Sequence, residues 1–387
     1  QVTKAQWPAK GQGGGIVWLN GHASVYVGSQ WAAGKPVGHA QLLDYSMAKW
    51  QGSYTETGYD GHHLADAVTR TGVDELFAVG SVDIADAAST TSAWVVRIDG
   101  TTGKSVATQV HGTKAEQRRF HAVTQSKAGA LVAVGSAPAK LKSDGEDGWL
   151  VGLSGKAAIQ WKSLVGGAGS DALHDVIAAA GGGYLAVGVD RDDKAQSSGL
   201  LVAIDDAGKV LWQKTLAPKG SQAALWSIAR GPATAYAVAG GADTGQTGGS
   251  PQPHFQAWLV RLAGAATKPP VSNIEAVLAA TTPQDKAYKG TKTSAIRDLL
   301  WTPSGTLVAA GWTGAVKGAT GLIDGAVWLI SKNNKASESH FFGAANKDHM
   351  TAITYYGGTI HGIGTADQGA LNGPHWLRAT IAPHKLS

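Results

Sequence analysis

The sequence from Ser170 to Asp193 reads SDALHDVIAAAGGGYLAVGVDRDD, and residues 199–216 read GLLVAIDDAGKVLWQKTL. Together they contain four short apolar runs: Leu173–Ala178, Tyr184–Val189, Leu200–Ile204 and Lys209–Leu216. Each run has the length and the β-branched content of a strand, and the Gly, Asp and Ser clusters between the runs supply turns. This stretch therefore predicts one four-stranded antiparallel sheet.

The same pattern recurs along the chain at intervals of about 50 residues, with a longer interval after Gly240. A small-apolar-Gly step closes the second strand of each repeat, at Gly28, Gly80, Gly135, Gly188, Gly240, Gly311 and Gly364. A Trp-Leu-Val type step marks the third strand, as at Trp149–Val151 and Trp258–Val260. A further Trp occurs in the fourth strand of some repeats, as at Trp161.

Four strands per repeat and seven repeats predict an all-β fold, a seven-bladed β-propeller of four-stranded antiparallel blades in one domain over residues 1–387. The expected blades start near Gly13, Gly61, Glu116, Asp171, Ser221, Thr291 and Asp348. The outer strand of the last blade is weak in the sequence, and either Ala382–Leu386 or the N-terminal segment 1–12, through Val2–Trp7, is expected to supply it. The N-terminal alternative closes the ring and removes an exposed sheet edge.

Composition narrows the functional classes. The chain has no Cys, which excludes disulfides, zinc-thiolate sites and cysteine nucleophiles. Its net charge of +5 favours weak attraction to anionic surfaces, but no Lys/Arg run or nucleic-acid module is present, so nucleic acid is not an expected partner. No apolar run has the length of a transmembrane segment. The 14 Trp and the low charged fraction of 16% favour a bacterial periplasmic or secreted protein.

Two turns carry a resemblance to a known group. The sequences Ile98–Lys104 and Ala203–Trp212 resemble the Asp-x-x-x-Gly-Lys-x-x-Trp turn of quinoprotein-like (PQQ-like) bacterial propellers. The resemblance implies an exported bacterial propeller of the non-catalytic kind found in scaffold and assembly proteins. Quinoprotein dehydrogenases of this type have eight-bladed rings, and many keep a vicinal Cys pair. Seven repeats and no Cys argue against PQQ chemistry here.

Polar and aromatic residues align at the expected starts of the inner strands, in His63–Asp66, Arg119–His121, Leu173–Asp175, Leu225–Ser227, Ile296–Asp298 and Met350–Ala352. Inner strands line the central channel, so these side chains are expected at its opening on one face, here called the top face. Arg binds carboxylates through two parallel hydrogen bonds, and Trp stacks on rings. Asp66, Asp175 and Asp298 are instead expected to bind turns or backbone amides.

The first functional hypothesis is an interaction module that binds a protein partner or an anionic glycan on the top face of the fourth to sixth blades, where the connecting segments are longest. The proposed ligand-binding residues are His174, Trp226, His254, Lys289, Arg297 and Trp312. Trp31 and Trp312 directly follow second strands and are expected on the same face.

Two other hypotheses come from different classes. One is a lyase or hydrolase that uses His121, His174 and His349 with Arg297, with or without a divalent ion. The other is a scaffold subunit of a cell-envelope complex, which predicts a broad apolar patch and no pocket. No cofactor is expected. Two acidic loops, Asp190–Asp193 and Asp144–Asp147, are candidate sites for Ca²⁺ or another divalent ion, although neither has EF-hand spacing.

Overall fold

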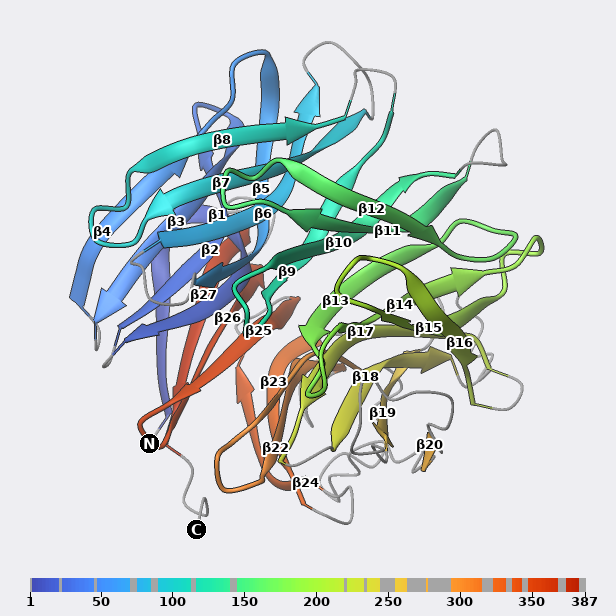
Figure 1. Cartoon of the computed structure of the whole chain (residues 1–387). Coiled ribbons are helices and arrows are strands. Elements are labelled where there is room, and N and C mark those ends of the chain that lie inside the picture. The colour runs from blue at the N-terminus through green and yellow to red at the C-terminus, as the bar shows by residue number, and fades with distance from the viewer. Residues whose placement is uncertain are drawn as a thin grey trace.

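The computed structural model describes residues 2–382 outside a set of short gaps. The gaps are residues 21–22, 45–46, 70–74, 85–89, 113–115, 140–144, 219–220, 233–234, 244–254, 263–275, 278–293, 315–322, 332–335, 343–346 and 368–373. The described residues form seven antiparallel blades around a central axis, as the sequence predicts (Figure 1). No helix capable of spanning a membrane is found among them.

The strands of the first four blades follow chain order from the axis outward. Blade 1 contains the second half of β1 (Val2–Asn20) with β2 (Ala23–Ala32), β3 (Lys35–Asp44) and β4 (Met47–Tyr54). Blade 2 contains β5 (Tyr59–Thr69), β6 (Glu75–Ile84), β7 (Thr91–Asp99) and β8 (Ser105–His111). Blade 3 contains β9 (Arg119–Gln125), β10 (Leu131–Pro138), β11 (Glu146–Leu153) and β12 (Ile159–Val165). Blade 4 contains β13 (Ala172–Ala178), β14 (Tyr184–Arg191), β15 (Ser197–Ile204) and β16 (Val210–Leu216).

The remaining blades repeat this order, and the last one borrows a strand. Blade 5 contains β17 (Ala223–Arg230), β18 (Tyr236–Asp243), β19 (Phe255–Leu262) and β20 (Ala276–Val277). Blade 6 contains β21 (Ser294–Trp301), β22 (Leu307–Gly314), β23 (Ile323–Ile330) and β24 (Ala336–Phe342). Blade 7 contains β25 (Asp348–Tyr356), β26 (Thr359–Asp367), β27 (Pro374–Ile381) and the first half of β1.

The long strand β1 closes the ring. Residues from Val2 to Lys10 pair with β27 as the outer strand of blade 7, and residues from Gly11 to Asn20 pair with β2 as the inner strand of blade 1. Blades 7 and 1 therefore share one seven-stranded sheet (Figure 1). The prediction that the N-terminal segment closes the ring is confirmed. The alternative, in which Ala382–Leu386 pairs with β27, is wrong because the first half of β1 takes that position.

The hydrophobic core lies between adjacent blades. Seven clusters of buried side chains each join two neighbouring blades, and the third-strand residues Trp94, Trp149, Trp258 and Trp328 are at most 4% exposed within them. The fourth-strand Trp161 packs against the edge of the cluster between blades 3 and 4. The repeated Trp positions thus serve the packing between blades, because each sheet must cover both faces with a neighbour.

Every inner strand contains a β-bulge at the same place. The residue left out of the pairing is Gly14, Ala65, His121, His174, Trp226, Arg297 or Thr351, in blades 1 to 7 respectively. Opposite each bulge lies the Gly that ends the second strand. A Cβ at Gly188 would lie 1.9 Å from the carbonyl oxygen of Ala172, and five other blades show the same approach. The sequence repeat therefore marks a bulge that only Gly accommodates.

Candidate functional site

Each bulge lies on the innermost strand of its blade, and in blades 3 to 6 the bulged residue has a large polar or aromatic side chain. A bulge bends its strand and changes the direction of a side chain, and bulges are common beside binding sites. His174 in blade 4 and Arg297 in blade 6 belong to blades that are not adjacent, yet Arg297 contributes to the lowered pKa of His174. Because only the channel connects these two blades, both side chains face it.

The channel lining is uneven. Blades 3 to 6 contribute His121, His174, Trp226 and Arg297, whereas blades 1 and 2 contribute Gly14 and Ala65. The guanidinium carbon of Arg297 lies 4.3 Å from the centre of the Trp226 ring, which is a cation–π contact between blades 5 and 6. The Arg297 side chain remains exposed to solvent in the channel, while the surrounding protein lowers its pKa from the usual value.

His121 and His174 stack on each other across blades 3 and 4, with ring centres 5.2 Å apart. His121 Nδ1 lies 2.8 Å from the carbonyl oxygen of Leu173. A carbonyl oxygen only accepts, so Nδ1 carries the hydrogen and Nε2 of the neutral ring is an acceptor. Burial lowers the pKa of both histidines, and for His174 the neighbouring His121, Arg297 and Arg191 lower it further.

A belt of carboxylates lies directly behind the bulges. Asp66 accepts a hydrogen bond from the amide of Val123 in the next blade at 2.9 Å. Asp175 accepts from the amide of Ile228 at 2.8 Å, and Asp298 accepts from the amide of Ile353 at 2.7 Å. These contacts confirm the expectation that the aspartates bind backbone amides. The belt fixes neighbouring inner strands to each other and so holds the channel residues in place.

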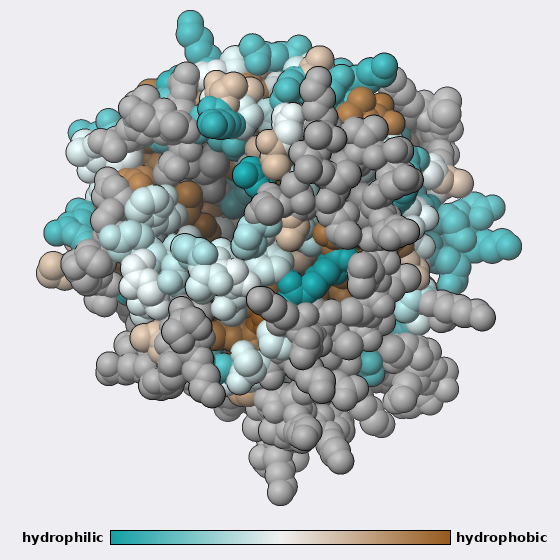
Figure 2. Space-filling view, turned by 60° about the horizontal axis from the view of Figure 1, so that its bottom comes forward, coloured by the Kyte–Doolittle hydropathy of each residue, from teal (hydrophilic) through white to brown (hydrophobic). Residues whose placement is uncertain are grey.

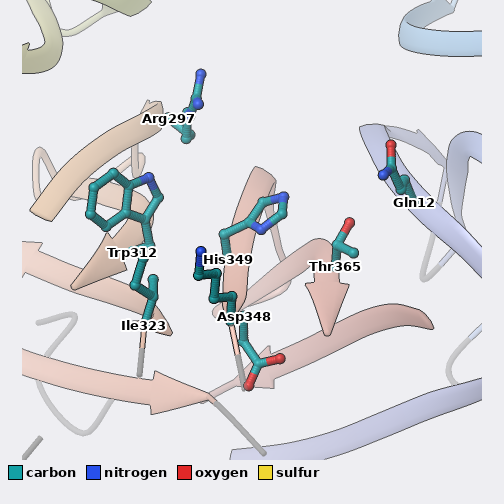
Figure 3. Close-up of a pocket in the computed structure, with 8 residues that line it drawn as sticks. Gln12, Arg297, Trp312, Ile323, Asp348, His349 and Thr365 are labelled. Carbon is teal, nitrogen blue, oxygen red and sulfur yellow. The ribbon is translucent and has the colours of Figure 1, made fainter. Parts of the chain in front are cut away.

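A pocket of about 410 Å³ opens beside the channel on the top face. It is lined by Gln12, Arg297, Trp312, Ile323, Lys347, Asp348, His349 and Thr365, from blades 6, 7 and 1. Burial and the nearby Arg297 lower the pKa of His349 to about 4, so its imidazole is neutral at pH 7. In Figure 3, Trp312 and Gln12 lie on opposite sides of the pocket, with His349 and Thr365 between them.

The structure brings together part of the predicted set. Arg297, Trp312 and His349 share the pocket, and Arg297 connects it to Trp226, His174 and His121 in the channel. His254 and Lys289 lie outside the described residues, as does Asp144 of one acidic loop. In the other loop, Asp192 accepts hydrogen bonds from the amides of Lys194 and Gln196, which accounts for it as a turn residue. Within the described ranges, no three His, Asp or Glu side chains form a metal-ligand set.

Gln12 and Thr365 were not predicted from the sequence as site residues. A signal for them exists in the repeat, because Thr365 directly follows Gly364 just as Trp312 directly follows Gly311. The residue after the Gly pairs with the start of the inner strand, as Thr365 pairs with His349 in blade 7 and Ser29 pairs with Gln12 in blade 1. The residue after the second-strand Gly is therefore a top-face position in every blade.

Comparisons with known proteins give the fold and nothing finer. No family model matches the chain, and no curated protein matches it in sequence. Among solved structures, the WD40 β-propeller domain of Doa1 is similar with a TM-score of 0.53 and 12% identity, over 98% of this chain and 96% of that one. Sqt1 from Chaetomium thermophilum has a TM-score of 0.51 and 15% identity, over 92% and 80%.

A third similar structure is the Hadza microbial sialidase Hz136. It has a TM-score of 0.51 and 9% identity, over 89% of this chain and 73% of that one. Identities this low show a common architecture alone and carry no information about activity, since one fold carries many functions. The comparisons therefore support the β-propeller fold, whose seven blades the strand pairing shows, and the function has to be argued from the site.

Proposed function

We propose that this propeller is an interaction module that binds an anionic group, presented by a protein partner or an acidic polysaccharide, at the top-face opening of the channel. The observation that carries the proposal is the set of contacts around the Arg297 side chain. Its guanidinium stacks on Trp226, lines a pocket of about 410 Å³ and has no carboxylate in ion-pair contact among the described residues. A partly desolvated guanidinium is a strong binding group for a carboxylate.

The surrounding charges favour an anion. Arg191 and Arg119 lie close enough to the stacked histidines to lower their pKa values, and Lys347 lies at the edge of the pocket. Asp175 and Asp298, behind the bulges, are already hydrogen-bonded to backbone amides, and Glu146 is the carboxylate whose charge acts on His121. The excess positive charge in the opening also attracts anions from solution.

The surface offers little support for the scaffold alternative. The large hydrophobic side chains exposed among the described residues are Trp18, Trp31, Met47, Val106 and Leu211, and they lie on five different strands. Figure 2 accordingly shows small brown areas among pale and teal ones on the described part of the face in view. The Trp-rich composition and the low charged fraction of 16% support an extracytoplasmic location, periplasmic or secreted.

The test compares two arginines on neighbouring strands. Arg297→Ala removes the pocket cation, and Arg230→Ala removes an exposed cation at the far end of the strand that carries Trp226. Binding of polygalacturonate, a Glu-rich peptide and neutral dextran is measured through tryptophan fluorescence at several salt concentrations. We expect at least one anionic probe to bind, with a dissociation constant about tenfold or more higher for Arg297→Ala and unchanged for Arg230→Ala. Equal binding by both variants, or no binding of either anion, overturns the proposal.

A second candidate is a lyase or hydrolase acting on an anionic substrate. His121 supports it, because a neutral imidazole with its Nδ1 hydrogen held by Leu173 presents Nε2 as a base. In this case His121→Ala abolishes turnover of a polyuronate, while the anion still binds. Turnover is measured as absorbance of the double bond that a lyase forms, and as the reducing ends that cleavage by a lyase or a hydrolase releases. Absence of turnover by the unaltered protein, with and without added divalent ions, contradicts this candidate.

A further inference from the structure

We propose that the top-face pocket takes a single carboxylated sugar residue of the uronic acid class, with its carboxylate on Arg297 and its ring against Trp312. This inference rests on the proposed anion-binding function and specifies its ligand. Three features of the pocket lead to it: the number of charges, the kind of neutral groups, and the aromatic wall.

The charges suit one carboxylate. Arg297 and Lys347 are the cations of the lining, and Asp348 is its only acidic residue. The Asp348 side chain is fully buried, and in Figure 3 its carboxylate points away from the space between Trp312, His349 and Gln12. Arg297 is therefore left to bind the ligand, and Lys347 is exposed at the rim, where salt and water screen it. One well-placed guanidinium matches one carboxylate better than it matches a polyanionic segment.

The remaining polar groups are neutral and suit hydroxyls. Thr365 is 4% exposed, and its hydroxyl has no hydrogen-bond partner among the described residues. The neutral imidazole of His349 both donates and accepts a hydrogen bond, and the Gln12 amide does the same. Groups that donate and accept are the natural partners of sugar hydroxyls, which also do both. An unpaired buried hydroxyl is costly, so a ligand that satisfies Thr365 gains affinity.

The wall opposite Gln12 is apolar. It consists of the half-buried ring of Trp312 with Ile323 beside it (Figure 3). One face of a pyranose ring presents C–H groups, and such a face packs on an aromatic ring through the hydrophobic effect and ring electrostatics. A volume of about 410 Å³ is at the low end of ordinary ligand sites, which suits one or two sugar rings. An acidic side chain of a peptide would occupy Arg297 but leave the hydroxyl-binding groups and the aromatic wall without matching partners.

The experiment is calorimetric titration of the full chain with galacturonate and glucuronate. The comparison ligands are galactose, glucose, the methyl ester of galacturonate and a Glu-rich peptide. We expect one of the two uronates to bind, with the neutral sugars and the ester at least about tenfold weaker, because they lack the charge that Arg297 recognises. Equal binding of the ester and the acid overturns the role given to the carboxylate.

Variants of the wall and of the hydroxyl site separate ring recognition from charge recognition. Trp312→Ala is expected to abolish uronate binding and Trp312→Phe to weaken it, whereas Trp31→Ala, an exposed Trp on the same face outside the pocket, leaves it unchanged. Thr365→Val keeps the shape, removes the hydroxyl and should weaken binding several-fold. Uronate binding that survives both Trp312→Ala and Thr365→Val overturns the inference.

The outcomes also distinguish this inference from the broader function. If the Glu-rich peptide binds in an Arg297-dependent way and neither uronate binds, the sugar assignment is wrong and the anion-binding function stands. If no anionic probe binds, both are wrong.

Discussion

Asp175 and Asp298 contact the same hydroxyl group, that of Ser227, each at 3.1 Å. The hydroxyl has one hydrogen and can donate it to only one of the two carboxylates. Ser227 already accepts a hydrogen bond from the amide of Leu299. A second acceptor position remains on its oxygen, so the other carboxyl group fits the contact when it is protonated and donates to Ser227.

The larger rise in pKa belongs to Asp298, so we infer that Asp298 holds the proton. Burial raises the pKa of Asp298 to about 7, with a further contribution from the charge of Asp175. Burial raises the pKa of Asp175 to about 6, and the amides of Ile228 and Val176 oppose the rise. Titration of the two groups is coupled, so the pair holds one proton more tightly than either carboxyl alone. We infer a chain of hydrogen bonds from Asp298 through Ser227 to Asp175, which joins blades 4, 5 and 6.

This network predicts that stability falls as the pH rises. Both carboxyls have folded-state pKa values above their ordinary value of 3.8, so between about pH 4 and pH 7 the folded protein binds more protons than the unfolded chain. Their stabilising contribution is complete below pH 4 and is lost as the pH rises through 6 to 7. The measurement is the free energy of unfolding by denaturant at several pH values, compared with that of Asp298→Asn.

The Asn variant imitates the protonated acid. Its amide nitrogen can donate to Ser227 while its oxygen accepts from the Ile353 amide, and only the contact of this position with the Leu299 amide is lost. We therefore expect the fall in stability between pH 4 and pH 7 to be reduced. Asp66→Asn, at the equivalent position of blade 2, serves as the matched control and should keep the fall. An unchanged pH profile in Asp298→Asn contradicts the shared-proton network.

The second-strand glycines predict a large destabilisation by a single methyl group. In Gly188→Ala the new Cβ would lie 1.9 Å from the Ala172 carbonyl oxygen, a contact that neither backbone segment can relieve without losing pairing. Overpacking of this kind costs about 3 kcal/mol or more of unfolding free energy. Gly34→Ala is the control, because its Cβ meets nothing within 4 Å and only the positive φ of 83° opposes it, at about 1 kcal/mol. Similar losses in the two variants would contradict the steric explanation.

The same glycines explain how far sequence reasoning reached. A short apolar step ending in Gly recurs because backbone geometry requires it in six of the blades, so the repeat predicted the blades and their number. The Trp rows were equally informative, because each blade buries both faces. The bulges themselves have no sequence pattern of their own, because the bulged residues differ in type from a glycine, Gly14, to a tryptophan, Trp226.

The site was harder to predict because its residues come from different blades. The sequence singled out Arg297, Trp312 and His349 as residue types suited to a ligand, but the pocket that they share depends on the order of the blades around the ring. Gln12 belongs to the strand that links blades 7 and 1, in a Gly-rich segment without any motif. Contacts such as that between Arg297 and Trp226 depend on how the inner strands of adjacent blades pack, which no local pattern contains.

Ring closure by β1 predicts that a short N-terminal deletion destabilises the whole propeller. Removing residues 2–10 leaves the inner strand of blade 1 in place but takes away the pairing from Val2–Ile381 to Lys10–His375, and it exposes the edge of β27. An unpaired edge favours association between copies. We expect a lower melting temperature and concentration-dependent oligomers in light scattering, whereas removal of residue 1 alone has no effect. A monomer of unchanged melting temperature after the longer deletion would contradict this role of β1.

Two histidines with similar pKa values but different causes provide the last prediction. Burial lowers the pKa of His39 to about 4, and burial together with the charge of Arg297 lowers the pKa of His349 to about 4. Arg297→Ala removes the charge and leaves most of the burial, so the pKa of His349 should rise part of the way towards 6.5 while that of His39 stays constant. Titration of the imidazole C–H resonances by NMR follows both residues in one sample.

An anion bound to Arg297 should raise the pKa of His349 in the unaltered protein as well, because it cancels the same charge. A uniform shift of both histidines would indicate a general loosening of the fold, and no shift of His349 in the variant would mean that Arg297 lies too far away to act on the pocket.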